Sequence, residues 1–123
     1  MQKIHTNSAP EAIGPYSQAV VTGNLVFTSG QIAINPETGL VEATTIEEQT
    51  EQVCKNLSEV LKQAGSSLKK AVKTVCFLSD MDNFAAFNEV YGKYFTEKPA
   101  RSCVAVKTLP KNVLVEVDVI AEI

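Results

Sequence analysis

The sequence has few of the residues from which metal and redox sites are built. Its three cysteines, Cys54, Cys76 and Cys103, are too far apart for a C-x-x-C pair. An odd number of cysteines fits reduced thiols better than a disulfide framework. The single histidine, His5, lies near the N-terminus. These absences exclude a cysteine-rich zinc site and a two-histidine metal site, and a Ser-His-Asp triad would depend on one poorly placed residue.

Basic clusters and long apolar runs are also missing. The chain has 11 Lys and Arg against 14 Asp and Glu, a net charge of −3, and its only notable basic pair is Lys69 and Lys70. This balance disfavours nucleic acid as a partner. No apolar run approaches the roughly 18 residues of a membrane-spanning helix, and residues 1–5 lack the apolar segment of a secretory signal. We therefore expect a cytoplasmic protein with no membrane partner.

What is present is typical of a globular protein. The chain has 123 residues, of which 45% are hydrophobic and 20% are charged. A chain of this length buries roughly two-thirds of the surface that it exposes when unfolded. We expect one domain over residues 1–123.

The first half of the sequence predicts a hairpin followed by a helix. The turn pair Gly23-Asn24 separates strand-like residues 19–22 from strand-like residues 25–32. Turn formers fill residues 35–39. Thr45 and Glu48 have the spacing of a capping box, which marks a helix start, and Gly65 supplies a helix end. Between them, apolar residues recur at helical spacing: Ile46, Val53, Cys54, Leu57, Val60, Leu61 and Ala64.

The second half predicts a strand, a helix and two further strands. Residues 71–78 form a short apolar run typical of a buried strand, and either Asp80 or Asp82 can cap the structure that follows. An aromatic stripe over residues 84–95 predicts a second helix, which ends before Pro99. Strands are expected at 101–106 and 113–123, and we expect these two to pair as a hairpin. The stripe consists of Phe84, Phe87, Val90, Tyr91, Tyr94 and Phe95, and it is interpreted as core.

This order of elements predicts an α+β fold with two helices on one face of a mixed sheet. Alternation along the last strand turns its valines toward the helices and turns Glu116 the other way, beside Leu114 and Ile120. That second face is too apolar for plain solvent, so a second copy of the chain is a candidate to cover it.

Two residues stand out as candidates for chemistry. Alternation places Arg101 and Cys103 on the same strand face. The guanidinium of Arg101 can bind a carboxylate through two parallel hydrogen bonds, although a surface charge is the simpler interpretation. Glu116 is either a solvated charge beside Asp118 or a partly desolvated acid, whose raised pKa would suit proton transfer.

Other candidates have ordinary explanations from spacing alone. Cys103 has no histidine within plausible strand reach and is interpreted as packing. Tyr16 follows a rigid turn and could simply pack at the surface. Gly30 either marks a bulge or lets another group approach the backbone closely.

Four separated motifs resemble one family. They are Ile-Gly-Pro-Tyr-Ser-Gln at 13–18, Thr-Ser-Gly-Gln-Ile at 28–32, Pro-Ala-Arg-Ser-Cys-Val at 99–104 and Leu-Pro-Lys at 109–111. Together they are similar to the RidA (YjgF/YER057c/UK114) family. The resemblance implies a chorismate-mutase-like fold, assembled as a homotrimer around a central β-barrel-like core with clefts between subunits.

The resemblance also implies an activity and a role for each motif residue. Members of this family hydrolyse enamines and imines, such as 2-aminoacrylate, 2-iminopropanoate and 2-iminobutanoate, to 2-keto acids and ammonia without a metal or cofactor. Arg101 would bind the substrate carboxylate, and Glu116 would position and activate water. The remaining residues implied to shape or adjoin the cleft are Tyr16, Ser29, Gly30, the backbone at Cys103, and Asn88.

Two other functions stay open. The runner-up is a non-enzymatic module that binds 2-keto acids or other carboxylates through Arg101 and reports them to a partner. An endoribonuclease or translation inhibitor ranks third, because the chain is acidic and lacks a groove of basic and aromatic residues.

Overall fold

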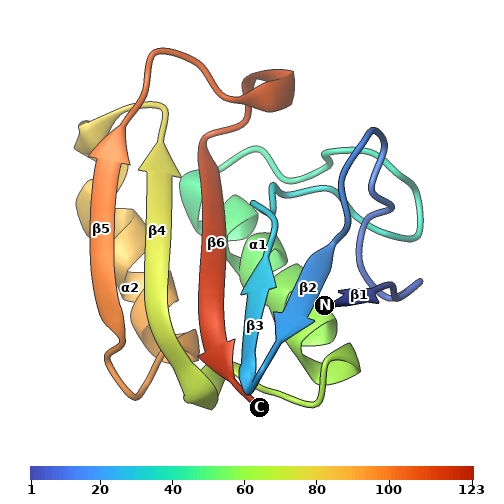
Figure 1. The fold of residues 1–123 in the computed structure, drawn as a ribbon. Coiled ribbons are helices and arrows are strands. Elements are labelled where there is room, and N and C mark those ends of the chain that lie inside the picture. Colours follow the sequence, from blue (N-terminus) through green and yellow to red (C-terminus); the bar gives the residue numbers. More distant parts are fainter.

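The computed structural model describes residues 1–123 and contains one six-stranded sheet in the order β1-β2-β3-β6-β4-β5. Strands β4 and β5 run parallel, and the other neighbouring strands are antiparallel (Figure 1). Short 3-10 turns occupy Leu68–Lys70, Met81–Asn83 and Pro110–Asn112. The strands and helices are β1 (Gln2–Ile4), β2 (Ala19–Thr22), β3 (Leu25–Thr28), α1 (Ile46–Gln63), β4 (Ala71–Leu78), α2 (Phe84–Tyr94), β5 (Ala100–Ala105) and β6 (Val115–Glu122).

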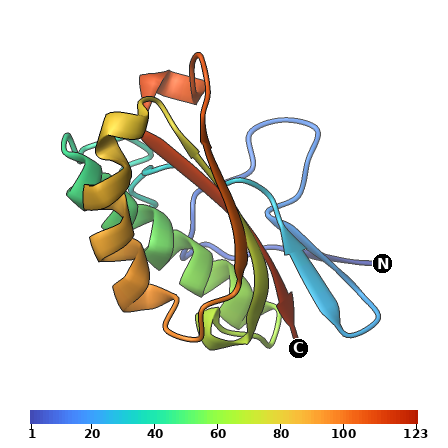
Figure 2. The same ribbon diagram turned by 90° about the vertical axis from the view of Figure 1, so that its left-hand side faces the viewer.

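Both helices cover the same face of the sheet, as predicted (Figure 2). Helix α1 begins at the expected capping box: the Glu48 backbone N–H donates to Thr45 Oγ1 at 3.2 Å, and the Thr45 N–H donates to the Glu48 carboxylate at 3.4 Å. Gly65 follows the helix with a φ of +82°, a conformation that favours glycine. Asp80 caps the 3-10 turn before α2, whereas α2 itself has no side-chain cap. None of the helices has the length and apolar character needed to cross a membrane.

The predicted pairing of the last two strands is wrong. Strand β4 lies between β5 and β6, so β5 pairs in parallel with β4 and β6 pairs with both β4 and β3. The cause is helix α2, which carries the chain from the end of β4 back along the sheet, so that β5 starts beside the start of β4. A hairpin needs only a short turn between neighbours, and the 3-10 turn Pro110–Asn112 instead carries the chain past β4 to its other edge.

The first hairpin is confirmed, but β3 ends at Thr28 rather than at residue 32. Ser29 and Gly30 leave the ladder, and Gln31 returns to exchange backbone hydrogen bonds of 2.9 and 3.1 Å with Val117. This short excursion places Gly30 beside β6. Strand β1, a three-residue strand that pairs with β2, was not predicted.

The core lies between the helices and the sheet. Alternation along β6 is confirmed: Val115, Val117, Val119 and Ala121 are buried on the helix side, whereas Ile123 lies beyond the strand and is exposed. The opposite side, here called the open face, carries no helix (Figure 2). Cross-strand register places on the open face Phe27 paired with Ile120, Val75 paired with Asp118, and Glu116 paired with Phe77, which also pairs with Val104. Phe27 and Val104 are 36% and 49% exposed, so this face is partly apolar and uncovered in the single chain.

Candidate functional site

Arg101 lies on β5, the edge strand, and points toward helix α2. Its Nη1 group donates a hydrogen bond of 2.7 Å to Oδ1 of Asn88. Its Cζ atom lies 4.9 Å from the ring centre of Tyr91 and 5.4 Å from that of Phe84. The one ion pair in the structure joins His5 to Glu11, so no carboxylate lies within 4.0 Å of the Arg101 guanidinium nitrogens. Arg101 is therefore a held and unneutralised cation, suited to binding an anion.

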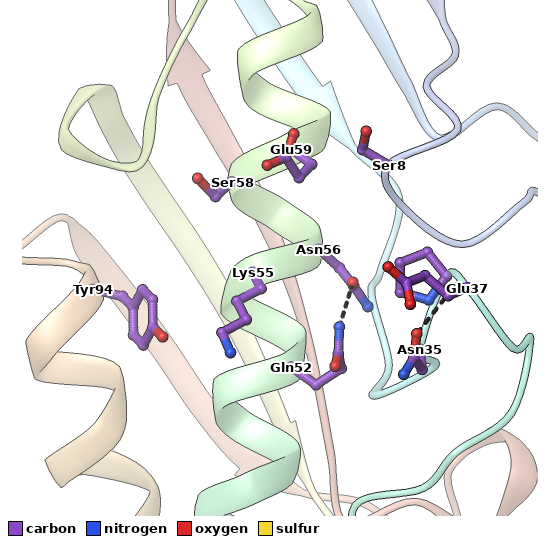
Figure 3. Close-up of a pocket in the computed structure, with 10 residues that line it drawn as sticks. Ser8, Asn35, Glu37, Gln52, Lys55, Asn56, Ser58, Glu59 and Tyr94 are labelled. Carbon is purple, nitrogen blue, oxygen red and sulfur yellow. Dashed lines mark hydrogen bonds between the residues drawn. The ribbon is translucent and has the colours of Figure 1, made fainter.

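A cavity of about 410 Å³ elsewhere on the helical side contains none of the predicted site residues. It lies between α1 and the loop that carries Asn35 and Glu37 (Figure 3). On α1, Gln52 donates a hydrogen bond of 2.9 Å to Asn56, whose own amide donates to backbone carbonyls of the loop. In the loop, the Glu37 N–H donates to Asn35 Oδ1 at 2.9 Å. The buried polar groups here are satisfied within the chain, so none of them is left unpaired toward the cavity.

A cavity of about 310 Å³ adjoins Arg101 at the end of α2. Lys98 also lines it, with a φ of +53°. Its lining contains two cations and no carboxylate, and the full set is Tyr91, Gly92, Phe95, Thr96, Lys98, Pro99 and Arg101.

Glu116 lies on β6 and faces the open side of the sheet, against Gly30. A Cβ atom placed on Gly30 would lie 2.6 Å from Oε2 of Glu116 and 2.8 Å from its Cδ. The carboxylate of Glu116 can therefore lie here only because residue 30 has no side chain. Burial raises the pKa of Glu116 above its ordinary value, and the neighbouring charge of Asp118 raises it further. This supports the interpretation of Glu116 as a partly desolvated acid.

Tyr16, Ser29, Gly30 and Glu116 line one cavity of about 600 Å³. The hydroxyl of Ser29 donates to the backbone carbonyl of Ser17 at 2.6 Å, which ties the β3 end to the loop before β2. The predicted cleft residues of the N-terminal half and Glu116 therefore do converge in space. The rest of the lining consists of Pro10, Glu11, Ile13, Gln18, Gln31, Ile32, Ile34, Pro110 and Lys111.

Lys111 is a lining residue that sequence reasoning did not single out. It lies in the Leu-Pro-Lys motif and has a φ of +56°, followed by Asn112 with a φ of +54°. Two successive left-handed residues with side chains are uncommon and tend to occur at functional sites. The motif was visible in the sequence, but the backbone conformation that singles out the residue was not.

Within one chain, Arg101 and Glu116 do not form a common site. Arg101 pairs with Thr74 of β4, on the helix side, and Glu116 pairs with Phe77, on the open face. The sheet separates them. Asn88, by contrast, does lie at the Arg101 half, as the resemblance implied.

The cysteines are not arranged for nucleophilic chemistry. Cys103 is half-buried on the Arg101 side, and its pKa is raised by burial, with Arg101 acting in the opposite direction. Burial raises the pKa of Cys76 to about 12 and that of Cys54 further still. A thiol with a raised pKa is a poor nucleophile at neutral pH. No group of three or more His, Cys, Asp or Glu side chains is placed to hold a metal ion.

Comparisons with known proteins identify the family. The family model described as endoribonuclease L-PSP matches residues 6–123. Reactive Intermediate Deaminase A, a chloroplastic protein of Arabidopsis thaliana, is 46% identical over 119 residues, which is 96% of this chain and 64% of that protein.

Solved structures agree in fold along the whole chain. RidA from the Antarctic bacterium Psychrobacter sp. PAMC 21119 has a TM-score of 0.96 and 42% identity, with 100% of each chain covered. TdcF of E. coli, solved with bound serine, has a TM-score of 0.95 and 40% identity, with 100% of this chain and 99% of that one covered. The chain therefore belongs to the endoribonuclease L-PSP family, the RidA family indicated by its motifs. The predicted α+β fold is confirmed.

Proposed function

We propose that the protein is an imine deaminase, which hydrolyses 2-iminobutanoate and 2-iminopropanoate to 2-keto acids and ammonia without a cofactor. The observation that carries this proposal is the guanidinium of Arg101, which is held by Asn88 and aromatic rings and faces no carboxylate of its own chain. It is available for the carboxylate of such a substrate. The name of the Arabidopsis relative supports the reaction class.

The site we propose combines two copies of the chain. Arg101 and Glu116 lie on opposite sides of one sheet, so a site that uses both must take them from different subunits. The partly apolar open face, which carries Glu116, and the uncovered edge strand β5 offer surfaces for such an assembly. We propose the homotrimer implied by the family resemblance, with a site at each subunit boundary.

The chemistry requires little beyond orientation. The protonated imine carbon is electrophilic, and Arg101 would hold it in place through the adjoining carboxylate. Glu116 would take a proton from water as the water oxygen bonds to that carbon. Glu116 would then return this proton to the nitrogen and take the hydroxyl proton of the tetrahedral intermediate as the C–N bond breaks, so that the carbonyl forms and ammonia leaves. The hydroxyl proton would pass on to the ammonia, which departs as ammonium. A carboxylate with a raised pKa suits these proton transfers near neutral pH.

The test generates the imine in place with a threonine or serine dehydratase, in the presence of semicarbazide as a competing trap. Wild-type protein should lower the yield of imine-derived semicarbazone and release keto acid. Arg101→Ala should lose both turnover and binding of 2-oxobutanoate, whereas Glu116→Gln should keep binding and lose turnover. Lys69→Ala and Glu122→Gln are controls, because both residues are exposed and neither lines a cavity near Arg101 or Glu116.

A second function, a carboxylate-binding sensor, is favoured by one observation. TdcF, of the same fold, was solved with bound serine, an amino acid with a carboxylate. A sensor would bind 2-oxobutanoate through Arg101 but would leave semicarbazone yield unchanged. Equal loss of binding in Arg101→Ala and Glu116→Gln would contradict the separate roles assigned above.

A further inference from the structure

We propose that Tyr91, anchored by Thr74, is a positioning residue that holds the Arg101 guanidinium in the orientation needed to bind a carboxylate. This inference rests on the proposed role of Arg101 and adds residues that act through it. It starts from a buried polar pair beside Arg101. Thr74 of β4 is 0% exposed, and its hydroxyl lies 2.7 Å from the hydroxyl of Tyr91 on α2.

The Thr74–Tyr91 pair lies next to Arg101, on the helix side of the sheet. Thr74 and Arg101 are register partners on the parallel strands β4 and β5, and both side chains face α2. The Thr74–Tyr91 hydrogen bond therefore joins α2 to the strand beside Arg101. This bond fixes the hydroxyl end of the Tyr91 ring beside the strand that carries Arg101.

The ring is held on its other sides as well. Phe95 stacks on Tyr91 with 4.5 Å between ring centres and 21° between ring planes, and the centre of Phe87 lies 5.3 Å away. The Cζ atom of Arg101 lies 4.9 Å from the Tyr91 centre, within the range of a cation–π interaction. The contacts with Thr74, Phe95 and Phe87 restrict the orientation of the Tyr91 ring, and the guanidinium packs against this ring.

Asn88 completes the orientation. It lies three residues before Tyr91 on the same helix, and it accepts a hydrogen bond of 2.7 Å from Nη1. With one N–H of Nη1 engaged, the edge formed by Nε and Nη2 keeps both of its donors for two parallel bonds to a carboxylate. Asn88 and Tyr91 together thus hold the guanidinium in one orientation and leave this edge for a ligand.

Stability alone does not explain the polar pair. Replacing both partners of a buried hydrogen bond with apolar groups of the same shape can be nearly neutral for folding. Thr74→Val and Tyr91→Phe each remove one hydroxyl and keep the shape, so the double variant Thr74→Val/Tyr91→Phe should fold.

The test measures KM and kcat for imine hydrolysis and the Kd for 2-oxobutanoate in the two single variants and the double variant. We expect KM and Kd to rise about three- to tenfold with kcat nearly unchanged, because a carboxylate bound equally in ground and transition states affects KM alone. The double variant should be no worse than the worse single variant, since all three remove the same bond. Thr50→Val is the matched control: Thr50 is also 0% exposed, and its hydroxyl donates to the Ile46 carbonyl within α1.

A spectroscopic readout is independent of activity. The Arg101 Nε–H resonance can be assigned by its absence in Arg101→Lys. Its chemical shift should include a ring-current contribution from the aromatic rings around Arg101, and it should move in Thr74→Val but not in Thr50→Val. Unchanged KM, Kd and resonance in folded Thr74→Val would overturn the proposal while leaving deaminase activity in place. If wild-type protein fails to hydrolyse imines, the proposed function fails, and Kd and the resonance still decide the positioning role.

Discussion

The Glu116 carboxylate occupies the space that a side chain on residue 30 would need. A substitution of Gly30 therefore tests whether the position of this carboxylate matters for activity. A Cβ atom on residue 30 would lie 2.6, 2.8 and 3.1 Å from Oε2, Cδ and Cγ of Glu116. The φ of Gly30 is not in the left-handed region, so alanine meets the carboxylate and not a strained backbone. Gly30→Ala should therefore displace Glu116 and lower kcat about tenfold to a hundredfold, with little change in melting temperature.

Ligand binding separates displacement of Glu116 from other effects of this substitution. If Gly30→Ala acts through Glu116, it should behave as Glu116→Gln does, with a lowered kcat and a Kd for 2-oxobutanoate as in wild type. Steady-state turnover and Kd of the three proteins, including wild type, give the comparison. Full activity in Gly30→Ala would show that the position of Glu116 in the structure is not the working one.

At the scale of the element, β6 carries two acids on its open face whose pKa values are both raised. Burial is the main cause for Glu116 and the cause for Asp118. Lys73 does not neutralise Asp118, because its ammonium donates to the hydroxyl of Ser102. An acid with a raised pKa binds its proton more tightly in the folded state, so the free energy of unfolding should fall as pH rises from about 4 through the raised pKa values.

Asp118→Asn should remove its share of this pH dependence. The decline in the free energy of unfolding between pH 4 and pH 8, measured with urea at one fixed protein concentration, should become smaller than in wild type. Glu122→Gln, at the exposed end of the same strand, should leave the slope as in wild type. A slope that is equally steep in Asp118→Asn would mean that burial of this carboxyl does not cost the folded state stability.

The elements also show which parts of the fold a sequence can predict. Helix α1 was predictable because its signals are local: Thr45 and Glu48 lie three residues apart, and Gly65 follows the last turn. The face of Glu116 was predictable because side chains alternate along a strand. The same alternation put Arg101 and Cys103 on one face, but it did not show that this face is the helix side. Strand pairing was not, since the position of β4 between β5 and β6 depends on contacts between distant residues. The Gly30–Glu116 approach and the Thr74–Tyr91 bond depend on the same long-range register and were missed for the same reason.

At the scale of the whole molecule, the sheet divides the proposed site in two. Arg101 lies on the helix side with Asn88, and Glu116 lies on the open face with Gly30, Ser29 and Tyr16. If the proposed site uses both residues, a single chain carries one half of each of two sites. Activity would then require assembly, and two differently inactivated subunits should restore each other.

Subunit complementation tests this arrangement directly. Arg101→Ala subunits keep Glu116, and Glu116→Gln subunits keep Arg101, so a boundary between the two in the right order contains both intact residues. Random mixing in equal amounts, by unfolding and refolding together, should restore about one site in four if the assembly is cyclic. Each variant refolded alone is the control and should stay inactive. Because a site contained in one chain would gain nothing from mixing, turnover near one quarter of wild type requires that neighbouring subunits supply Arg101 and Glu116, and absence of recovery in mixed assemblies would contradict it.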